Sequence, residues 1–420
     1  MPESVLINNN INQSKFSNNI IVKLFKEYLY TFSLYSRQIA STAVLLLIVR
    51  YLSIYDFGLF SSYKNIATFC LIFANLDFAN YILVSSKTRV KEIKLKISLF
   101  IINAILLVII ISICSTLFKL ANHFLFFLVL LRTFLDITFW GLILPYFQAA
   151  RKFNTIASIN IIYSSCILII AVISYFFKFS LVKFLLLNIG IGFINVLQFS
   201  YSAKINYSLV FPYIKRFIKM LDNSIWGYMG STITDYIYAQ ISSLYVAIFL
   251  PKESAALYFA AFTIGSLVSL FAAAQIQKML PEMINNSTES IKKILKKNLF
   301  FVWTILLGIL LVLAISGRFI LKLVYGQEYY MNAYPILIIF IISNILITNG
   351  GIFGAYLTAI GKQVLKVKMK IETSIITLIC LCLLHKLGIY GAVISLLISS
   401  IYVSIRYTLC SIKLLNATNT

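Results

Sequence analysis

The chain has 420 residues, of which 60% are hydrophobic and only 12% are charged, with a mean hydropathy of +0.92. Ordinary globular domains are roughly 45–50% apolar and about 25% charged, so this composition excludes a water-soluble protein. The net charge of +23 does not indicate nucleic-acid binding, because no basic recognition helix, zinc spacing or aromatic-basic module accompanies it.

Apolar blocks recur along the whole chain, and about 20 apolar residues suffice for a helix to span about 30 Å of hydrocarbon. The first six blocks cover residues 29–49, 57–84, 97–117, 124–149, 156–177 and 184–201. The second six cover residues 225–250, 255–277, 299–315, 333–359, 371–387 and 389–409. We therefore predict an all-α membrane protein with twelve transmembrane helices.

The basic residues gather in alternate loops, most densely in residues 87–96 and 292–297. Positive residues are retained on the cytoplasmic side during insertion, so both termini are predicted to be cytoplasmic. The polar, Asn-rich N-terminal segment lacks the apolar stretch of a signal peptide, and none is expected. The six Cys residues lie in or beside apolar blocks without metal or disulfide spacing, so they indicate no metal site.

The two halves of the chain resemble each other. Residues 50–60 overlay residues 248–258 at a spacing of 198, and residues 99–107 overlay residues 299–307 at a spacing of 200. The residues matched at a spacing of 210 are Tyr146 with Tyr356, Ala149 with Ala359 and Lys152 with Lys362. These matches predict a six-helix lobe at residues 1–201, a basic linker at 202–223 and a second six-helix lobe at 224–420. Both lobes have one orientation, which implies an axis along the membrane normal.

Two basic residues within the first two blocks are candidates for substrate binding, because an ionisable group in the bilayer is costly unless it faces water or a partner. Arg37 shares one helical stripe with Tyr30, Ser33 and Ser41, which predicts that this face is turned to a wet interior. A guanidinium forms bidentate bonds to phosphate oxygens. A packing arginine is the alternative. Lys64 is predicted to offer a second cation, although snorkelling to the interface is an equal alternative.

Four more charged residues are candidates for coupling or gating. Arg132 and Asp136 lie one turn apart and are expected to pair as a structural salt bridge, with a gating or proton-linked role second. Asp235 lies on a polar stripe of the seventh block, where a desolvated carboxylate has a raised proton affinity and is able to bind a proton or Na⁺. A hydrogen-bonded, structural aspartate is the equal alternative. It occupies the position that matches the region of Arg37 in the first half. Asp77 is expected to tie neighbouring helices.

Short motifs resemble the Wzx-type O-antigen and polysaccharide flippases of the multidrug/oligosaccharidyl-lipid/polysaccharide exporter superfamily. The residues that carry the resemblance are Arg50-Tyr-Leu-Ser-Ile-Tyr-Asp-Phe-Gly-Leu-Phe, Asn75-Leu-Asp-Phe-Ala-Asn, Gln148-Ala-Ala-Arg-Lys and Thr358-Ala-Ile-Gly-Lys. The resemblance implies a MATE-like fold of two lobes around a central cationic cavity in a bacterial inner membrane. It also implies ion-coupled flipping of an undecaprenyl-pyrophosphate-linked oligosaccharide to the periplasmic leaflet.

The resemblance implies a transporter without a cofactor, driven by H⁺ or Na⁺ and working with membrane lipid, a polysaccharide polymerase and a chain-length regulator. A multidrug or small-cation exporter of the same superfamily is the alternative, although such an exporter is expected to have an acidic cavity. A peptidoglycan-precursor flippase is a further alternative. A membrane enzyme is disfavoured because the external loops are too short to carry a catalytic domain.

Overall fold

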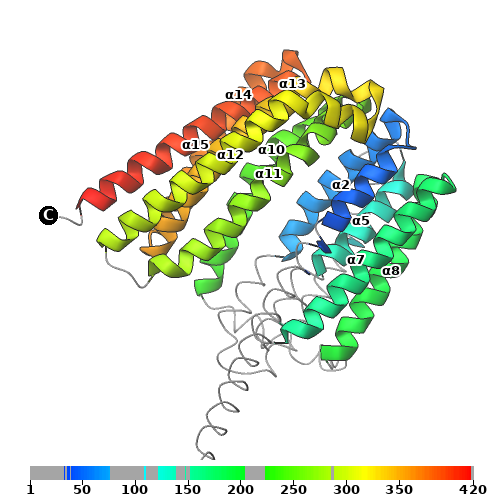
Figure 1. Cartoon of the computed structure of the whole chain (residues 1–420), viewed down its shortest axis with the longest axis horizontal. Coiled ribbons are helices and arrows are strands. Elements are labelled where there is room, and N and C mark those ends of the chain that lie inside the picture. The colour runs from blue at the N-terminus through cyan, green and yellow to red at the C-terminus, as the bar shows by residue number, and fades with distance from the viewer. Residues whose placement is uncertain are drawn as a thin grey trace, which may run out of the picture. The chain divides into compact units, whose positions relative to one another are not determined.

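The computed structural model describes residues 33, 36–37, 39–75, 108–109, 122–138, 147, 152–203, 223–284 and 288–417. Within these residues the regular structure is entirely helical (Figure 1). Contacts divide the chain into two compact units. Unit 1 comprises Met1–Ile48, Asp77–Leu106 and Phe134–Met220, and unit 2 comprises Val49–Leu76, Leu107–Thr133 and Leu221–Thr420. The predicted lobes at 1–201 and 224–420 stay a prediction.

Unit 1 contains the hairpin of α7 (Phe153–Phe176) and α8 (Leu181–Ala203), which pack against each other. The C-terminal end of α5 (His123–Thr138) also belongs to this unit. The turn between α7 and α8 is tight because Lys178 adopts a positive φ of 47°. The amides of Phe177 and Phe179 then bond the last carbonyls of α7, at 2.9 and 3.0 Å.

Unit 2 is built mainly from long helices. Their bounds are α2 (Ile54–Asn75), α10 (Asn223–Phe249), α11 (Lys252–Ile284), α12 (Thr288–Tyr325), α13 (Gln327–Ala359), α14 (Gln363–Leu384) and α15 (Ile389–Ala417). The pairs α11 with α13 and α13 with α15 pack extensively. Asn349 of α13 ties three helices together: it accepts a hydrogen bond from Trp303 Nε1 at 3.2 Å and donates to Ser404 Oγ at 2.8 Å and Thr408 Oγ1 at 3.2 Å.

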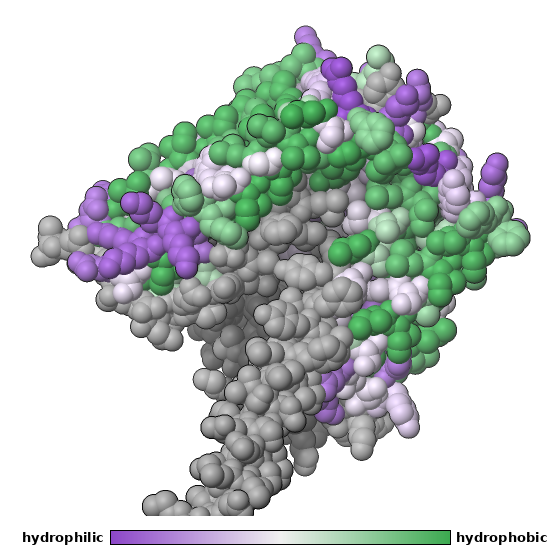
Figure 2. All heavy atoms as spheres, viewed as in Figure 1, coloured by the Kyte–Doolittle hydropathy of each residue, from purple (hydrophilic) through white to green (hydrophobic). Residues whose placement is uncertain are grey.

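The described helices present apolar surface suited to lipid. Five of them are long and apolar enough to cross a membrane: Asn154–Phe176, Leu181–Phe199, Glu289–Tyr325, Met331–Ala359 and Ile389–Asn416. Figure 2 shows hydrophobic atoms along α12 and hydrophilic atoms at the end where α12 begins. Leu311, Ile315 and Phe319 of this helix are 62%, 78% and 66% exposed. A soluble monomer rarely exposes such a continuous apolar face. The twelve-helix count stays a prediction.

The segment at residues 50–60 has a defined structural role in unit 2. Ser53 caps α2, because its Oγ accepts a bond from the Asp56 amide at 3.1 Å and donates to Asp56 Oδ2 at 2.7 Å. The Phe57 ring is fully buried against Tyr325 and Tyr329, with centroids 6.2 Å away in each case. A Cβ on Gly58 would overlap the Lys252 carbonyl oxygen, so glycine permits the close approach of α2 to α11. The motif therefore fixes how α2 packs within unit 2.

The two halves share local geometry at the spacings that the sequence predicts. At 198 residues, the carbonyls of Ser53 and Pro251, which precede α2 and α11, each accept a bond of 3.0 Å from the amide four residues later. At 210 residues, Lys152 and Lys362 precede α7 and α14 with (φ, ψ) of (−88°, 53°) and (−88°, 44°). Their amides bond the carbonyls five residues earlier, at 2.9 and 2.8 Å. Gly388, at φ 57°, likewise matches Lys178.

Candidate functional site

A buried polar cluster in unit 1 is centred on Arg37. This side chain is only 3% exposed, and its Nη2 lies 3.3 Å from Asp136 Oδ1 near the C-terminal end of α5. Its Nη1 lies 3.5 Å from Asn160 Oδ1 on α7. The guanidinium carbon lies 4.1 Å from the centre of the Tyr163 ring. Tyr163 Oη in turn donates to Asp136 Oδ1 at 3.2 Å. The cluster therefore holds one cation between a carboxylate, an amide and an aromatic face.

The helix period of α7 explains why its polar residues meet at this cluster. Asn160, Tyr163 and Ser164 lie three and four positions apart, so they project from one side of the helix. They are 0%, 3% and 5% exposed, respectively. Their apolar neighbours Ile156, Ile159 and Ile167 are also buried, which makes this the packed face of α7. The polar side chains are therefore inside unit 1 and not in contact with lipid.

The cluster retains hydrogen-bond donors that its described neighbours do not satisfy. Within the part of the chain that the structure describes, the buried Nδ2 of Asn160 and the buried Oγ of Ser164 have no hydrogen-bond partner. Leaving a buried donor unsatisfied costs about 1–3 kcal/mol, so such groups indicate a place for a ligand or water. The Arg37 contacts of 3.3 and 3.5 Å are also longer than ideal charge-assisted bonds of about 2.7–2.9 Å. An oxyanion is the ligand that this set of donors fits.

The Asp136 carboxylate sets a condition on any such ligand. Its side chain is 39% exposed, whereas that of Arg37 is 3% exposed, so the acid lies at the accessible side of the ion pair. A phosphate oxygen approaching Arg37 would meet repulsion from this carboxylate unless Asp136 moves or takes up a proton. The Arg37 guanidinium can therefore release the Asp136 carboxylate and bind the anionic oxygen of a ligand in its place.

Only two of the predicted site residues are seen in contact with each other in the described part of the chain. Arg37 and Asp136 come together in unit 1, and Arg132 lies half-buried on α5. Lys64 lies on α2 of unit 2 with an exposed side chain, and its carbonyl accepts a bond from Thr68 at 2.8 Å. Asp235 belongs to α10, but its side chain lies outside the described residues, as does all of Asp77. The roles assigned to these residues stay predictions.

Two members of the cluster, Asn160 and Tyr163, were not identified from the sequence. Asn160 and Ser164 form a four-residue polar step in an otherwise apolar block, which is the signal that would have marked this face of α7. The sequence predicts that Asp136 pairs with Arg132, one turn away, and this pair stays a prediction. The structure gives Asp136 a contact with Arg37, 99 positions earlier, which the sequence did not predict.

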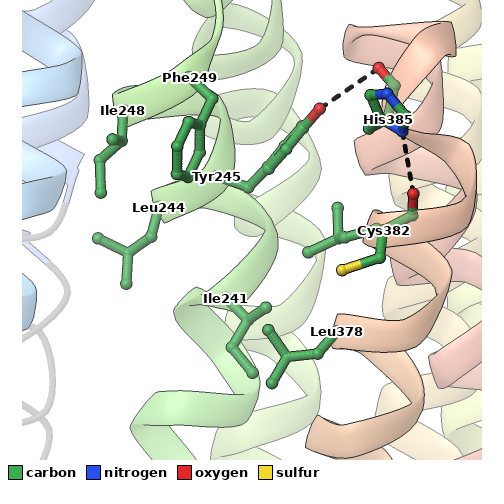
Figure 3. Close-up of a pocket in the computed structure, with 9 residues that line it drawn as sticks. Ile241, Leu244, Tyr245, Ile248, Phe249, Leu378, Cys382 and His385 are labelled. Carbon is green, nitrogen blue, oxygen red and sulfur yellow. Dashed lines mark hydrogen bonds between the residues drawn. The ribbon is translucent and has the colours of Figure 1, made fainter.

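A second feature is an apolar groove between α10 and α14 in unit 2 (Figure 3). Its volume is about 540 Å³, and it is lined by Ile241, Leu244, Tyr245, Ile248, Phe249, Leu378, Leu381, Cys382 and His385. Ile241 and Leu381 are buried, whereas Ile248 and Leu378 are 55% and 50% exposed, so the groove is open at its side. The polar groups at its end are engaged, because Tyr245 Oη donates to the His385 carbonyl at 3.4 Å.

The chain shares its fold with solved membrane transporters. No family model matches the sequence, and no curated protein sequence is similar to it. A structure described as the lipid II flippase MurJ in an inward closed conformation superposes with a TM-score of 0.71 and 17% identity, covering 92% of this chain and 87% of that one.

Two further structures have the same fold. A structure described as a MOP superfamily transporter from Pyrococcus furiosus, with a binding pocket of reversed polarity, gives a TM-score of 0.62 and 15% identity over 94% of this chain and 95% of that one. An outward-facing multidrug resistance transporter of the MATE family gives a TM-score of 0.61 and 14% identity, covering 94% of this chain and 96% of that one. These similarities confirm the predicted MATE-like, all-helical fold.

Proposed function

We propose that the protein is a flippase that moves an undecaprenyl-pyrophosphate-linked oligosaccharide, such as an O-antigen repeat unit, from the cytoplasmic to the periplasmic leaflet of a bacterial inner membrane. The observation that carries this proposal is the buried Arg37 guanidinium beside the unsatisfied donors of Asn160 and Ser164. A permanent cation beside the unsatisfied donors of Asn160 and Ser164 suits a phosphate head group. The fold shared with transporters, one of them a lipid II flippase, supports the proposal.

The α10–α14 groove offers an apolar place for the hydrocarbon tail of a lipid-linked substrate. A polyprenyl chain has to stay in hydrocarbon while its head group is inside protein. The groove is apolar, opens sideways and lies along the last two to three turns of α10, about 12 Å at 1.5 Å per residue. Two lysines stand at the end of these helices: Lys386 follows His385, and Lys252 Nζ donates to the Ala247 carbonyl at 2.8 Å. An apolar polyprenyl tail is the proposed occupant of the groove.

A small-cation exporter is the second candidate, and the partly exposed Asp136 carboxylate is the observation that favours it. In that case Asp136 would bind the transported cation directly. The buried Arg37 beside it disfavours this reading, because a resident guanidinium already neutralises the carboxylate. A peptidoglycan-precursor flippase has the same head-group chemistry and differs in the attached sugar and peptide.

The test uses purified full-length protein in proteoliposomes and measures the initial rate at which an undecaprenyl-pyrophosphate-linked oligosaccharide changes leaflet. A matched control exists in Arg318 of α12, which is exposed and whose guanidinium carbon lies 4.9 Å from the centre of the Tyr334 ring. We expect Arg37→Ala to lose transport and Arg318→Ala to keep it. Full transport by Arg37→Ala would remove Arg37 from the site, and export of organic cations without transport of the lipid would favour the second candidate. The same assay under an imposed gradient of H⁺ or of Na⁺ identifies the coupling ion as the one whose gradient raises the rate.

A further inference from the structure

An ion pair lies on the outer side of α14 and α15 in unit 2. The Nε of Arg406 on α15 lies 3.4 Å from Oε2 of Glu372 on α14. The hydroxyl of Tyr402, one turn before Arg406, donates to the same oxygen at 2.9 Å. The side chains of Arg406 and Glu372 are 44% and 27% exposed, so the pair lies at the protein surface and not in the core. We refer to this surface as the α14–α15 seam.

The surface around the ion pair is apolar on both helices. Its exposed neighbours are large aliphatic side chains: Ile371, Ile375, Ile405 and Leu409. Arg406 also lies within the apolar span Ile389–Asn416, which is long enough to cross a membrane. Charged groups that face hydrocarbon are costly unless a polar partner accompanies them. The surroundings therefore indicate that the polar part of a lipid is the neighbour of this pair.

The Arg406 guanidinium has donors available for such a neighbour. Within the part of the chain that the structure describes, Nε is the one donor of this guanidinium with a hydrogen-bond partner, so both Nη groups are open to a ligand. Arginine binds phosphate oxygens in a bidentate manner through such a pair of donors. The bond from Nε to Glu372 also orients the guanidinium plane, and this preorganisation lowers the entropic cost of binding an oxyanion.

Two lysines extend the seam toward one end of the helices. Lys368 is one turn before Glu372 on α14, so the two share a helical stripe. Lys413 is two turns after Arg406 on α15 and lies on its stripe in the same way. The helices pack against each other and are joined through the short η4 turn (His385–Leu387), so they run antiparallel. Both lysines are exposed and lie on the same side of the ion pair, about 6 and 10 Å along the helix axes at 1.5 Å per residue.

We propose that the α14–α15 seam binds an anionic phospholipid, with the head-group phosphate at Arg406, Lys368 and Lys413. Three cations and the Glu372 carboxylate give the seam a net charge of +2, which favours an anionic lipid over a zwitterionic one. The acyl chains extend from this phosphate toward η4 along exposed side chains of both helices: Ile375, Ile379, Ile398 and Ile401. The lysines mark the membrane side that the basic loops predict to be cytoplasmic. This site does not depend on which substrate the protein transports.

The test is native mass spectrometry of purified full-length protein titrated with phosphatidylglycerol or with zwitterionic phosphatidylethanolamine. The site variants are Arg406→Gln and the double variant Lys368→Gln with Lys413→Gln. The control, Lys293→Gln with Lys296→Gln, removes two exposed lysines from the first turns of α12. We expect phosphatidylglycerol to bind the wild type more tightly than phosphatidylethanolamine. Each site variant should lose affinity for phosphatidylglycerol by about tenfold or more, and the control should stay within about twofold.

The double lysine variant keeps the test independent of folding. In the described residues, the side chains of Lys368 and Lys413 form no hydrogen bond or ion pair, so their replacement should leave Tm unchanged. An equal loss of affinity in the control would show diffuse attraction to any basic surface and would overturn the proposal, as would equal affinity for the two lipids. Binding of undecaprenyl pyrophosphate that needs Arg406, with phosphatidylglycerol binding unchanged by Arg406→Gln, would assign the seam to the substrate and overturn the phospholipid site.

Discussion

Replacing Arg37 by alanine tests the unit 1 cluster most sharply. The change removes a charge-assisted contact to Asp136, worth about 1.5–3 kcal/mol, and a cation–π contact to Tyr163, worth about 1–2 kcal/mol when desolvated. Because the Asp136 side chain is 39% exposed, solvent screening reduces the first contribution. We therefore expect a loss of about 2–4 kcal/mol in stability. If the guanidinium also binds the head group, transport falls by a further factor of about 10–100 per folded molecule.

A second variant separates stability from transport. The double variant Arg37→Met with Asp136→Asn removes both charges while keeping side-chain volume, so it should regain much of the stability without regaining transport. Arg37→Lys keeps the charge but loses the planar fork and the stacking on Tyr163, so it should recover transport only in part. Flux per folded molecule is measured in proteoliposomes, and Tm is measured in detergent. Normal flux in the double variant would refute the reasoning, because the cluster would then be structural.

Three further changes test the packing, the groove and a buried phenol. Gly58→Val should lower Tm by separating α2 from α11. The control is Gly190→Ala, whose added Cβ meets no atom within 4 Å and should leave Tm nearly unchanged. Equal changes of Tm in a thermal scan would contradict the close approach of α2 to α11. Leu378→Trp should fill the α10–α14 groove and reduce cross-linking to a photoreactive polyprenyl phosphate. The control Leu311→Trp, on the exposed face of α12, should not reduce it. Similar labelling of both variants would show that the probe binds as boundary lipid and not in the groove. Burial raises the pKa of Tyr51, in the turn before α2, to about 12. The unfolded chain therefore releases this proton first, near the ordinary pKa of about 10, and stability falls between about pH 10 and 12. Tyr51→Phe should weaken this alkaline loss, and an unchanged slope of Tm against pH would contradict the assignment.

The helices of unit 2 followed closely from apolar blocks in the sequence. The block at 225–250 corresponds to α10 (Asn223–Phe249), and the block at 333–359 to α13 (Gln327–Ala359). The block at 299–315 underestimated α12 (Thr288–Tyr325), because hydropathy detects only the part of a helix that suits lipid. The lysine-rich first turns of α12 are good helix formers in water, so the helix continues beyond the apolar block.

The contacts of the candidate site were less accessible to sequence reasoning. Helical periodicity placed Arg37 on one stripe with Ser33 and Ser41, because side chains three and four apart share a face. Arg37 and Ser33 are buried, whereas Ser41 is exposed. Periodicity identifies a face but not the helix that faces it. The partners Asp136 and Asn160 lie 99 and 123 positions away, and a single sequence carries no signal that links such distant residues. The Arg132–Asp136 pair was favoured because it is local.

The internal repeat predicted where local backbone geometry recurs in the second half of the chain. Its spacings of 198 and 210 reappear in the starts of helices and in matched turns, down to the positive φ of Lys178 and Gly388. A turn conserves backbone geometry even where side chains differ, which is why the spacing survives while Arg37 and Asp235 carry opposite charges.

The most direct measurement of the central claim compares two substrates in one preparation of reconstituted protein. Initial rates are recorded for an undecaprenyl-pyrophosphate-linked oligosaccharide and for a lipophilic organic cation, in wild type and in Arg37→Ala. We expect the wild-type protein to move the anionic lipid at a rate that depends on Arg37, with little flux of the cation. Transport of the cation, unaffected by Arg37→Ala and without movement of the anionic lipid, would contradict the claim that this guanidinium binds a phosphorylated head group.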